Sequence, residues 1–99
     1  MYARHVTVHG SPDHVDEAVA SVRDHVIPVL QQCAGFKGQL LLVDRAKGEA
    51  IGISLWDTEE NRAASDAKVA ASRQQTADQV GADSPPDIAL YELPIFEIT

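Results

Sequence analysis

The stretch Ile51–Glu60, which reads IGISLWDTEE, decides the architecture of this chain. Apolar and small residues run up to Trp56, and Asp57-Thr58 then supplies a helix N-cap that acidic residues follow. The stretch therefore predicts a strand that ends at a tryptophan and passes directly into a helix. A large amphipathic ring at such a junction either fills the core or forms the wall of a pocket.

Composition excludes several classes of function. We expect the 99 residues to form one domain, residues 1–99. A net charge of −7 and scattered basic residues argue against a nucleic-acid partner, because phosphate binding needs clustered Lys and Arg. No segment approaches the roughly 18 apolar residues of a membrane span, and the start of the chain does not read as a signal peptide. Cys33 is the single cysteine, so no internal disulfide forms, which fits a reducing, cytoplasmic setting.

Two helices are predicted from the 3.6-residue period. The first begins at the N-cap Ser11, is kinked at Pro28 and ends at Gly35. Its buried stripe is spaced by three and four residues: Val15, Val19, Val22, Val26, Val29 and Cys33. The second runs from Thr58 to about Val80, and its buried stripe is expected to be mostly alanine: Ala63, Ala67, Ala70, Ala71 and Ala77.

Four strands are predicted around these helices. Arg4–His9 alternates with period two, Leu40–Asp44 and Glu49–Trp56 form a hairpin, and Ile88–Ile98 is a last apolar strand that Pro94 interrupts. The order β-α-β-β-α-β predicts a ferredoxin-like α+β fold with an antiparallel sheet. Two helices cover only one face of such a sheet, yet the second and fourth strands are apolar on both faces. We therefore expect a homodimer in which a second copy covers the open face.

The chain resembles the antibiotic-biosynthesis-monooxygenase-type dimeric α/β-barrel superfamily. The resemblance is carried by Gly35–Gly38, by the turn Asp44–Gly48 and by Ser54–Glu60. It implies that two subunits close a barrel, with a pocket in each subunit between sheet and helices. The superfamily that the chain resembles includes cofactor-free oxygenases that act on quinol-like aromatic polyketides, haem-degrading enzymes, and barrels with no established reaction.

Site residues carry over from this resemblance only in part. Trp56 matches, whereas Gly52 stands where the polyketide-oxidising members use an asparagine, and Ser65 stands where many members carry a histidine. The second helix has neither the axial His nor the Trp of the haem-degrading branch, so we expect no haem. No cofactor and no metal are expected.

Trp56 and Arg4 are the candidate catalytic residues, and Gly52, Ser54 and Ala67 are the candidate pocket residues. Trp56 either stacks on a planar aromatic ligand or plugs the core. Arg4 shares the face of Val6 and Val8 and either holds an anionic oxygen in the pocket or is a solvated arginine at a strand end. The small side chains of Gly52 and Ser54, opposite an alanine helix, indicate an unfilled cavity, although an alanine stripe also suits close helix–sheet packing.

His5 and His9 lie on the other strand face. Four residues of strand separate them by roughly 13 Å, too far for a shared metal ion, so structural or interface roles are favoured over a role as a lone acid or base.

Two functions remain open. The first is a cofactor-free monooxygenase, or a related small oxidoreductase, that acts on a planar phenolic or quinol-like compound. The second is a non-catalytic dimeric barrel that binds a small apolar ligand or serves as an assembly module. A pocket with convergent polar groups favours the enzyme, and a collapsed, dry interior favours the barrel.

Overall fold

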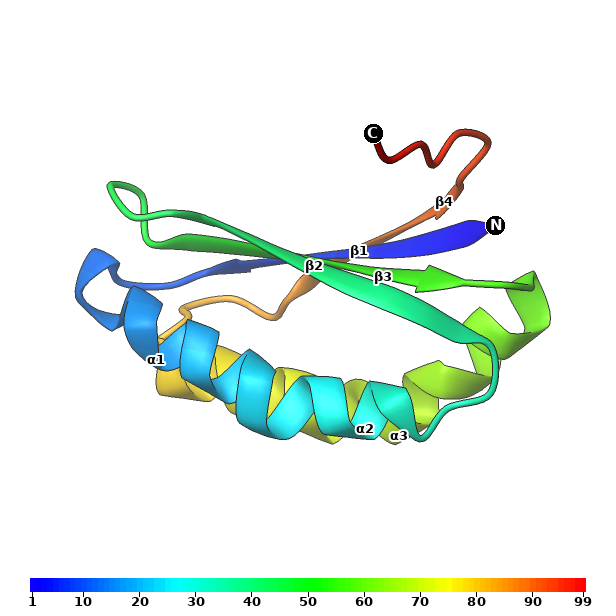
Figure 1. Cartoon of the computed structure of the whole chain (residues 1–99). Coiled ribbons are helices and arrows are strands. Elements are labelled where there is room, and N and C mark those ends of the chain that lie inside the picture. The colour runs from blue at the N-terminus through cyan, green and yellow to red at the C-terminus, as the bar shows by residue number, and fades with distance from the viewer.

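The computed structural model describes residues 1–99 and has the predicted order of strands and helices (Figure 1). Its strands are β1 (Tyr2–His9), β2 (Phe36–Asp44), β3 (Glu49–Trp56) and β4 (Asp87–Glu92). They form one antiparallel sheet in the order β2-β3-β1-β4. The predicted ferredoxin-like α+β fold is confirmed.

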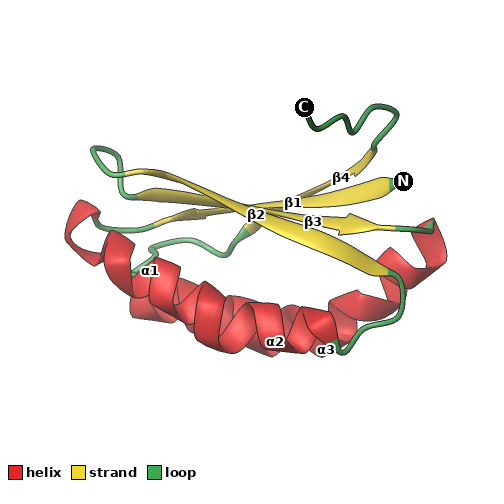
Figure 2. Cartoon of the chain, in the orientation of Figure 1, coloured by secondary structure: helices red, strands yellow, loops and turns green.

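All helices cover one face of the sheet (Figure 2). The first helical region begins with a short 3-10 turn, η1 (Pro12–His14), and continues as α1 (Val15–Ser21), a π-helical segment η2 (Val22–Val26) and α2 (Ile27–Gln31). The second helix is α3 (Glu59–Gln79), and the Thr58 side chain caps it as predicted, accepting a hydrogen bond from the Asn61 amide. No helix combines the length and apolar character that a membrane crossing needs.

The interruption in the first helical region changes which residues are buried. Pro28 lacks an N–H and cannot complete the α-helical ladder, and the π-helical segment lies directly before it. A π turn carries one extra residue, and in the turn after it the fully buried position moves forward by one. Leu30 is the fully buried residue of α2, whereas Val29 of the predicted stripe is half-buried and packs against the core from its edge.

The alanine stripe predicted for α3 is also wrong. Four of its five alanines are exposed, and only Ala77 is buried. The side of α3 that meets the sheet instead carries arginines, hydroxyl residues and valine: Arg62, Ser65, Val69, Arg73, Thr76 and Ala77. Long arginine stems cover apolar surface as a leucine would, which lets this polar face pack against the sheet.

The last strand is shorter than the predicted Ile88–Ile98. Strand β4 ends at Glu92, and the proline at position 94 cannot donate to a strand ladder. The chain end then rises on the side of the sheet that faces away from the helices (Figure 1). Large apolar side chains of this end are exposed: Ile95, Phe96 and Ile98.

Strand register divides the sheet into two faces. Arg4, Val6 and Val8 of β1 share the helix-covered face with Gly52 and Ser54 of β3. On the opposite face Leu40, Leu42 and Tyr91 stay exposed. The main apolar core lies between sheet and helices, where it has two parts, one around Trp56 and Leu30 and one around Val8 and Ala77.

Candidate functional site

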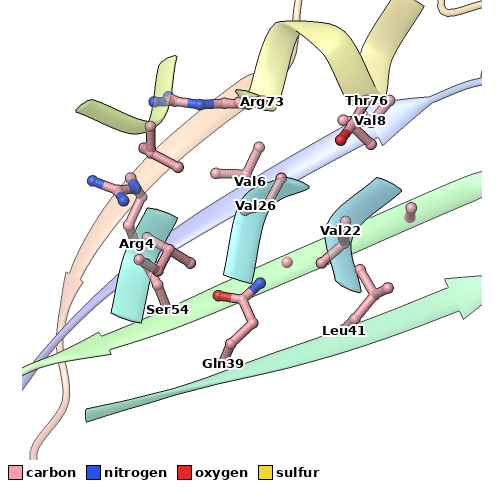
Figure 3. Close-up of a pocket in the computed structure, with 14 residues that line it drawn as sticks. Arg4, Val6, Val8, Val22, Val26, Gln39, Leu41, Ser54, Arg73 and Thr76 are labelled. Atoms are coloured by element: carbon pink, nitrogen blue, oxygen red, sulfur yellow. The ribbon is translucent and has the colours of Figure 1, made fainter. Parts of the chain in front are cut away.

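A cavity lies between the sheet and the helices, in the gap between the two parts of the core (Figure 3). Its volume is about 60 Å³. Most of its wall is apolar, from Val6 and Val8 of β1 and from Val22 and Val26 of the first helical region. Polar side chains converge on it from β1, β2, β3 and α3: Arg4, Gln39, Ser54, Arg73 and Thr76.

Arg4 is placed in this cavity by strand parity and held there by α3. The residue is only 3% exposed, and its Nη1 donates to Ser65 Oγ at 2.9 Å and to the Arg62 carbonyl at 3.3 Å. Its guanidinium carbon lies 5.5 Å from the centre of the Trp56 ring, in cation–π range. Nε and Nη2 of Arg4 make no hydrogen bond within the chain, so these donors remain available to a ligand.

Ser65 explains how a charged side chain reaches the interior. The Ser65 hydroxyl donates to the Arg62 carbonyl at 2.6 Å and accepts from Arg4. A small hydroxyl at this position of α3 leaves room for the guanidinium and supplies its acceptor. The residue that stands in place of a histidine therefore serves to hold Arg4.

Two further arginines on the buried side of α3 join Arg4. Arg73 lines the cavity at 8% exposure, and its Nη2 donates to Asp66 Oδ1 at 2.6 Å. Arg62 is 6% exposed and donates through Nη1 to the carbonyls of Ala3 and Tyr91. Three of the five arginines of this acidic chain are thus buried around one place in the fold.

Negative charge at this cluster is scarce. Asp66 is the carboxylate within ion-pair distance of both cavity arginines, 4.0 Å from Arg4 Nη1, and it is 54% exposed. Burial lowers the pKa of Arg4; the positive charge of Arg73 lowers it further, and Asp66 partly opposes the shift. Guanidinium groups stay protonated even so, and the cavity therefore carries a surplus of positive charge.

Trp56 lies beneath the cavity and not in its wall. The ring is fully buried, packs edge-on against Phe36 at 5.5 Å, and donates from Nε1 to Ser54 Oγ at 2.9 Å. Its contacts with the site run through Arg4 and Ser54. The placement matches the core-plug alternative, and the ring face is not open to a stacked ligand.

The predicted pocket residues divide in the structure. Gly52 and Ser54 line the cavity, whereas Ala67 is exposed on α3 and its assignment to the pocket is wrong, because the alanine side of the helix faces outward. The sequence prediction missed Gln39, whose amide nitrogen comes within 2.9 Å of where a Cβ at Gly52 would lie. Gln39 Oε1 is buried without a hydrogen-bond partner. The available signal was strand parity, because Gln39, Leu41 and Val43 share one face of β2.

His5 and His9 stay outside this site. The His5 ring meets Tyr91 edge-on at 6.2 Å, and His9 lies 3.5 Å from carboxylate oxygens of Glu49 and Asp87. No three His, Cys, Asp or Glu side chains are grouped so that they could hold a metal ion.

A second hollow opens outside the cavity. It lies between α3 and β4, encloses about 310 Å³, and is lined by Arg62, Asp66, Ile88 and Leu90 among others. Arg4 lines both spaces. Arg4 therefore links the cavity to this outer hollow.

Comparison with known proteins gives relatives in sequence and in fold. No family model matches the chain. It is 44% identical over 77 residues to the uncharacterized protein Rv2558 of Mycobacterium tuberculosis, and 40% identical over 81 residues to Rv2557. These matches cover 78% and 82% of this chain but 33% and 36% of the relatives, so the chain spans about a third of their length.

Several solved structures share the whole fold. A monooxygenase from the ActVA-Orf6 gene of Streptomyces coelicolor, solved with nanaomycin D, aligns with a TM-score of 0.80 at 15% identity, over 99% of this chain and 91% of that one. The NE2512 protein of Nitrosomonas europaea, of unknown function, aligns at 0.78 and 18% identity, over 99% and 93%. A protein named antibiotic biosynthesis monooxygenase aligns at 0.68 and 14% identity, over 94% and 98%. The chain therefore has the fold of the antibiotic-biosynthesis-monooxygenase-type proteins, as its sequence motifs predict.

Proposed function

We propose that this chain is a cofactor-free monooxygenase that acts on a planar phenolic or quinol-like compound in the helix-side cavity. The observation that carries the proposal is the cavity itself, in which apolar walls surround converging Arg4, Arg73, Gln39 and Ser54 side chains. Neighbours of the same fold are named monooxygenases, and one was solved with the ligand nanaomycin D.

The chemistry proposed here draws its electrons from the substrate. A phenol plus dioxygen gives a quinone plus water: one oxygen atom forms the new carbonyl, and the other leaves as water with the two hydrogens removed. The first step is loss of the phenolic proton, which nearby positive charge favours. Arg4 would steady the resulting anion, and the phenolate would then pass an electron to dioxygen.

Trp56 enters this proposal as a positioning residue. Its ring lies against the Arg4 guanidinium, and its indole N–H engages the cavity residue Ser54. A rigid ring below the site limits the rotamers open to Arg4, which keeps the charge where the anion forms.

The test is oxygen consumption with a panel of planar phenols and quinols, followed by mass spectrometry after reaction under labelled dioxygen. We expect uptake with at least one compound, and a product that has gained one labelled oxygen and lost two hydrogens. Arg4→Met should abolish the uptake, while Arg45→Met, at an exposed pair with Asp16, should not change it. Unlabelled product, or equal rates for the two variants when both are folded by circular dichroism, contradicts the proposal.

A second candidate, a non-catalytic barrel that binds a small ligand, is favoured by a specific feature of the site. No histidine lines the cavity, and Gly52 and Ser65 provide no group that moves protons. This candidate predicts saturable binding with no oxygen uptake above the rate in buffer.

We also propose that the chain is a homodimer through the open face of its sheet. Leu40, Leu42 and Tyr91 are exposed there, and the apolar end 95–98 has no place on its own subunit. One self-complementary face that buries these side chains twice is the simplest arrangement that removes them from water. Sedimentation equilibrium at micromolar concentration should give twice the 10.7 kDa chain mass, and a single-chain mass would contradict the proposal.

A further inference from the structure

The charge balance of the cavity indicates the chemistry of what it binds. Arg4 and Arg73 share one carboxylate, Asp66, which is half exposed and lies on the outer side of the cluster. Two buried guanidinium groups against one half-solvated carboxylate leave about one positive charge uncompensated. A buried charge without a partner is costly, so an anion that enters the cavity would be strongly stabilised.

Hydrogen-bond capacity gives the same answer. Each guanidinium offers five N–H donors. Within the chain Arg4 uses only Nη1, and Arg73 uses only Nη2. The remaining donors suit an acceptor with two oxygens, because a carboxylate matches the planar fork of an arginine.

Gln39 defines a second polar point in the same cavity. Its side chain rises from β2 over Gly52, between the valines and Ser54 (Figure 3). Oε1 is buried and accepts no hydrogen bond, a state that is destabilising in a protein interior. A hydroxyl donor on the ligand would satisfy this oxygen.

The volume of the cavity suits a small ligand. A single water occupies roughly 10–15 Å³ of such a cavity volume. The 60 Å³ of this cavity therefore holds about four to six waters. At about 30 Å³ of liquid volume per water, this corresponds to a ligand of roughly 120–180 Å³. One aromatic ring with its substituents fits that space.

We infer that the cavity takes a single-ring aromatic carboxylate that carries a hydroxyl group. The carboxylate binds the free donors of Arg4 and Arg73, the ring packs among Val6, Val22 and Val26, and the hydroxyl donates to Gln39 Oε1. The inference rests on the proposed function because it names the substrate class of the same site.

Calorimetric titration tests the inference with 4-hydroxybenzoate, its neutral methyl ester, benzoate and inorganic phosphate. We expect one 4-hydroxybenzoate per chain, and an affinity at least about tenfold above that of the ester, as the loss of a charge-assisted bond predicts. Benzoate should bind several-fold more weakly than 4-hydroxybenzoate, and phosphate should not compete. An ester that binds as tightly as the acid, or phosphate that displaces it, overturns the inference.

Variants locate the bound anion. Arg73→Met should weaken 4-hydroxybenzoate at least about tenfold and leave the ester nearly unchanged, whereas Arg45→Met should change neither. Gln39→Met, which keeps the length of the side chain, should erase the difference between 4-hydroxybenzoate and benzoate. Equal losses of affinity for 4-hydroxybenzoate in Arg73→Met and Arg45→Met overturn the inference. Should Arg73→Met fail to fold, the comparison of the acid with its ester in the unmodified chain is the deciding test.

The two proposals fail separately. Binding of the acid without oxygen uptake by any compound refutes the oxygenase and leaves the anion site in place. Oxygen uptake with neutral phenols, together with no saturable binding of the acid at millimolar concentration, refutes the anion site and leaves the oxygenase.

Discussion

Trp56→Phe measures how much the buried ring contributes to the fold. The change removes the indole N–H bond to Ser54 Oγ, worth about 1 kcal/mol. It weakens the cation–π contact with Arg4 by about 0.5–1 kcal/mol, since phenylalanine has the weaker ring field. The smaller ring also leaves an unfilled space in a fully buried site, which adds about 1 kcal/mol. We therefore expect a loss of about 2.5–3 kcal/mol of unfolding free energy and a fall in Tm of about 10–24 °C.

Urea unfolding followed by far-ultraviolet circular dichroism, at one fixed protein concentration, is the assay for this loss. Ser54→Ala provides the matched control because it removes the acceptor and keeps the ring. The double variant should be more stable than the sum of the two single losses implies, by about 1 kcal/mol, because both changes break the same bond. A loss below about 0.5 kcal/mol for Trp56→Phe, or strict additivity, would refute the assignment of Trp56 as a core residue tied to Ser54.

Three further outcomes follow from the backbone and the surface. Gly35→Ala should lower the unfolding free energy by roughly 2–4 kcal/mol, against about 1 kcal/mol for Gly81→Ala. Both glycines have positive φ, but only at Gly35 would a Cβ collide with Asp57 and Asn61. Equal losses of the two variants in urea unfolding would contradict this. The side-chain amide of Asn61 donates to Asp57 and lowers the pKa of that carboxyl below 3.8, so this hydrogen bond stabilises the fold at neutral pH and is lost as pH falls through the lowered pKa. Asn61→Ala should therefore flatten the pH dependence of stability below pH 3.8. An unchanged pH dependence in this acid range would contradict the assignment. Deletion of residues 95–98 should weaken self-association in sedimentation equilibrium, and an unchanged association constant would count against a role in the dimer.

Local patterns predicted the elements of this fold well because each pattern has one dominant physical cause. Strand alternation placed Arg4 on the face of Val6 and Val8, and the structure puts it there. Thr58 lies where the strand pattern stops and acidic residues begin, and it caps α3. The forward shift from Val29 to Leu30 was not predictable, since it depends on how the chain before Pro28 relaxes.

The candidate site was harder to predict because arginine is read as a surface residue. In α3 and its C-cap the only large apolar residues are Val69 and Val80. A stripe drawn through them at helical spacing also contains Arg62, Ser65, Arg73 and Thr76, which is the buried side of the helix. Alanine carries little information about burial, so the alanine stripe led to the wrong face and to Ala67.

The measurement that tests the central claim most directly is nuclear magnetic resonance of the arginine Nε–H groups during titration with 4-hydroxybenzoate. The chain has five arginines, of which Arg4 and Arg73 line the cavity, while Arg23 and Arg45 lie exposed. An anion held inside the cavity should shift the Arg4 and Arg73 signals along one saturable curve and leave the Arg23 and Arg45 signals in place. Signals of Arg4 and Arg73 that do not move, or that move no more than those of Arg23 and Arg45, would contradict the account.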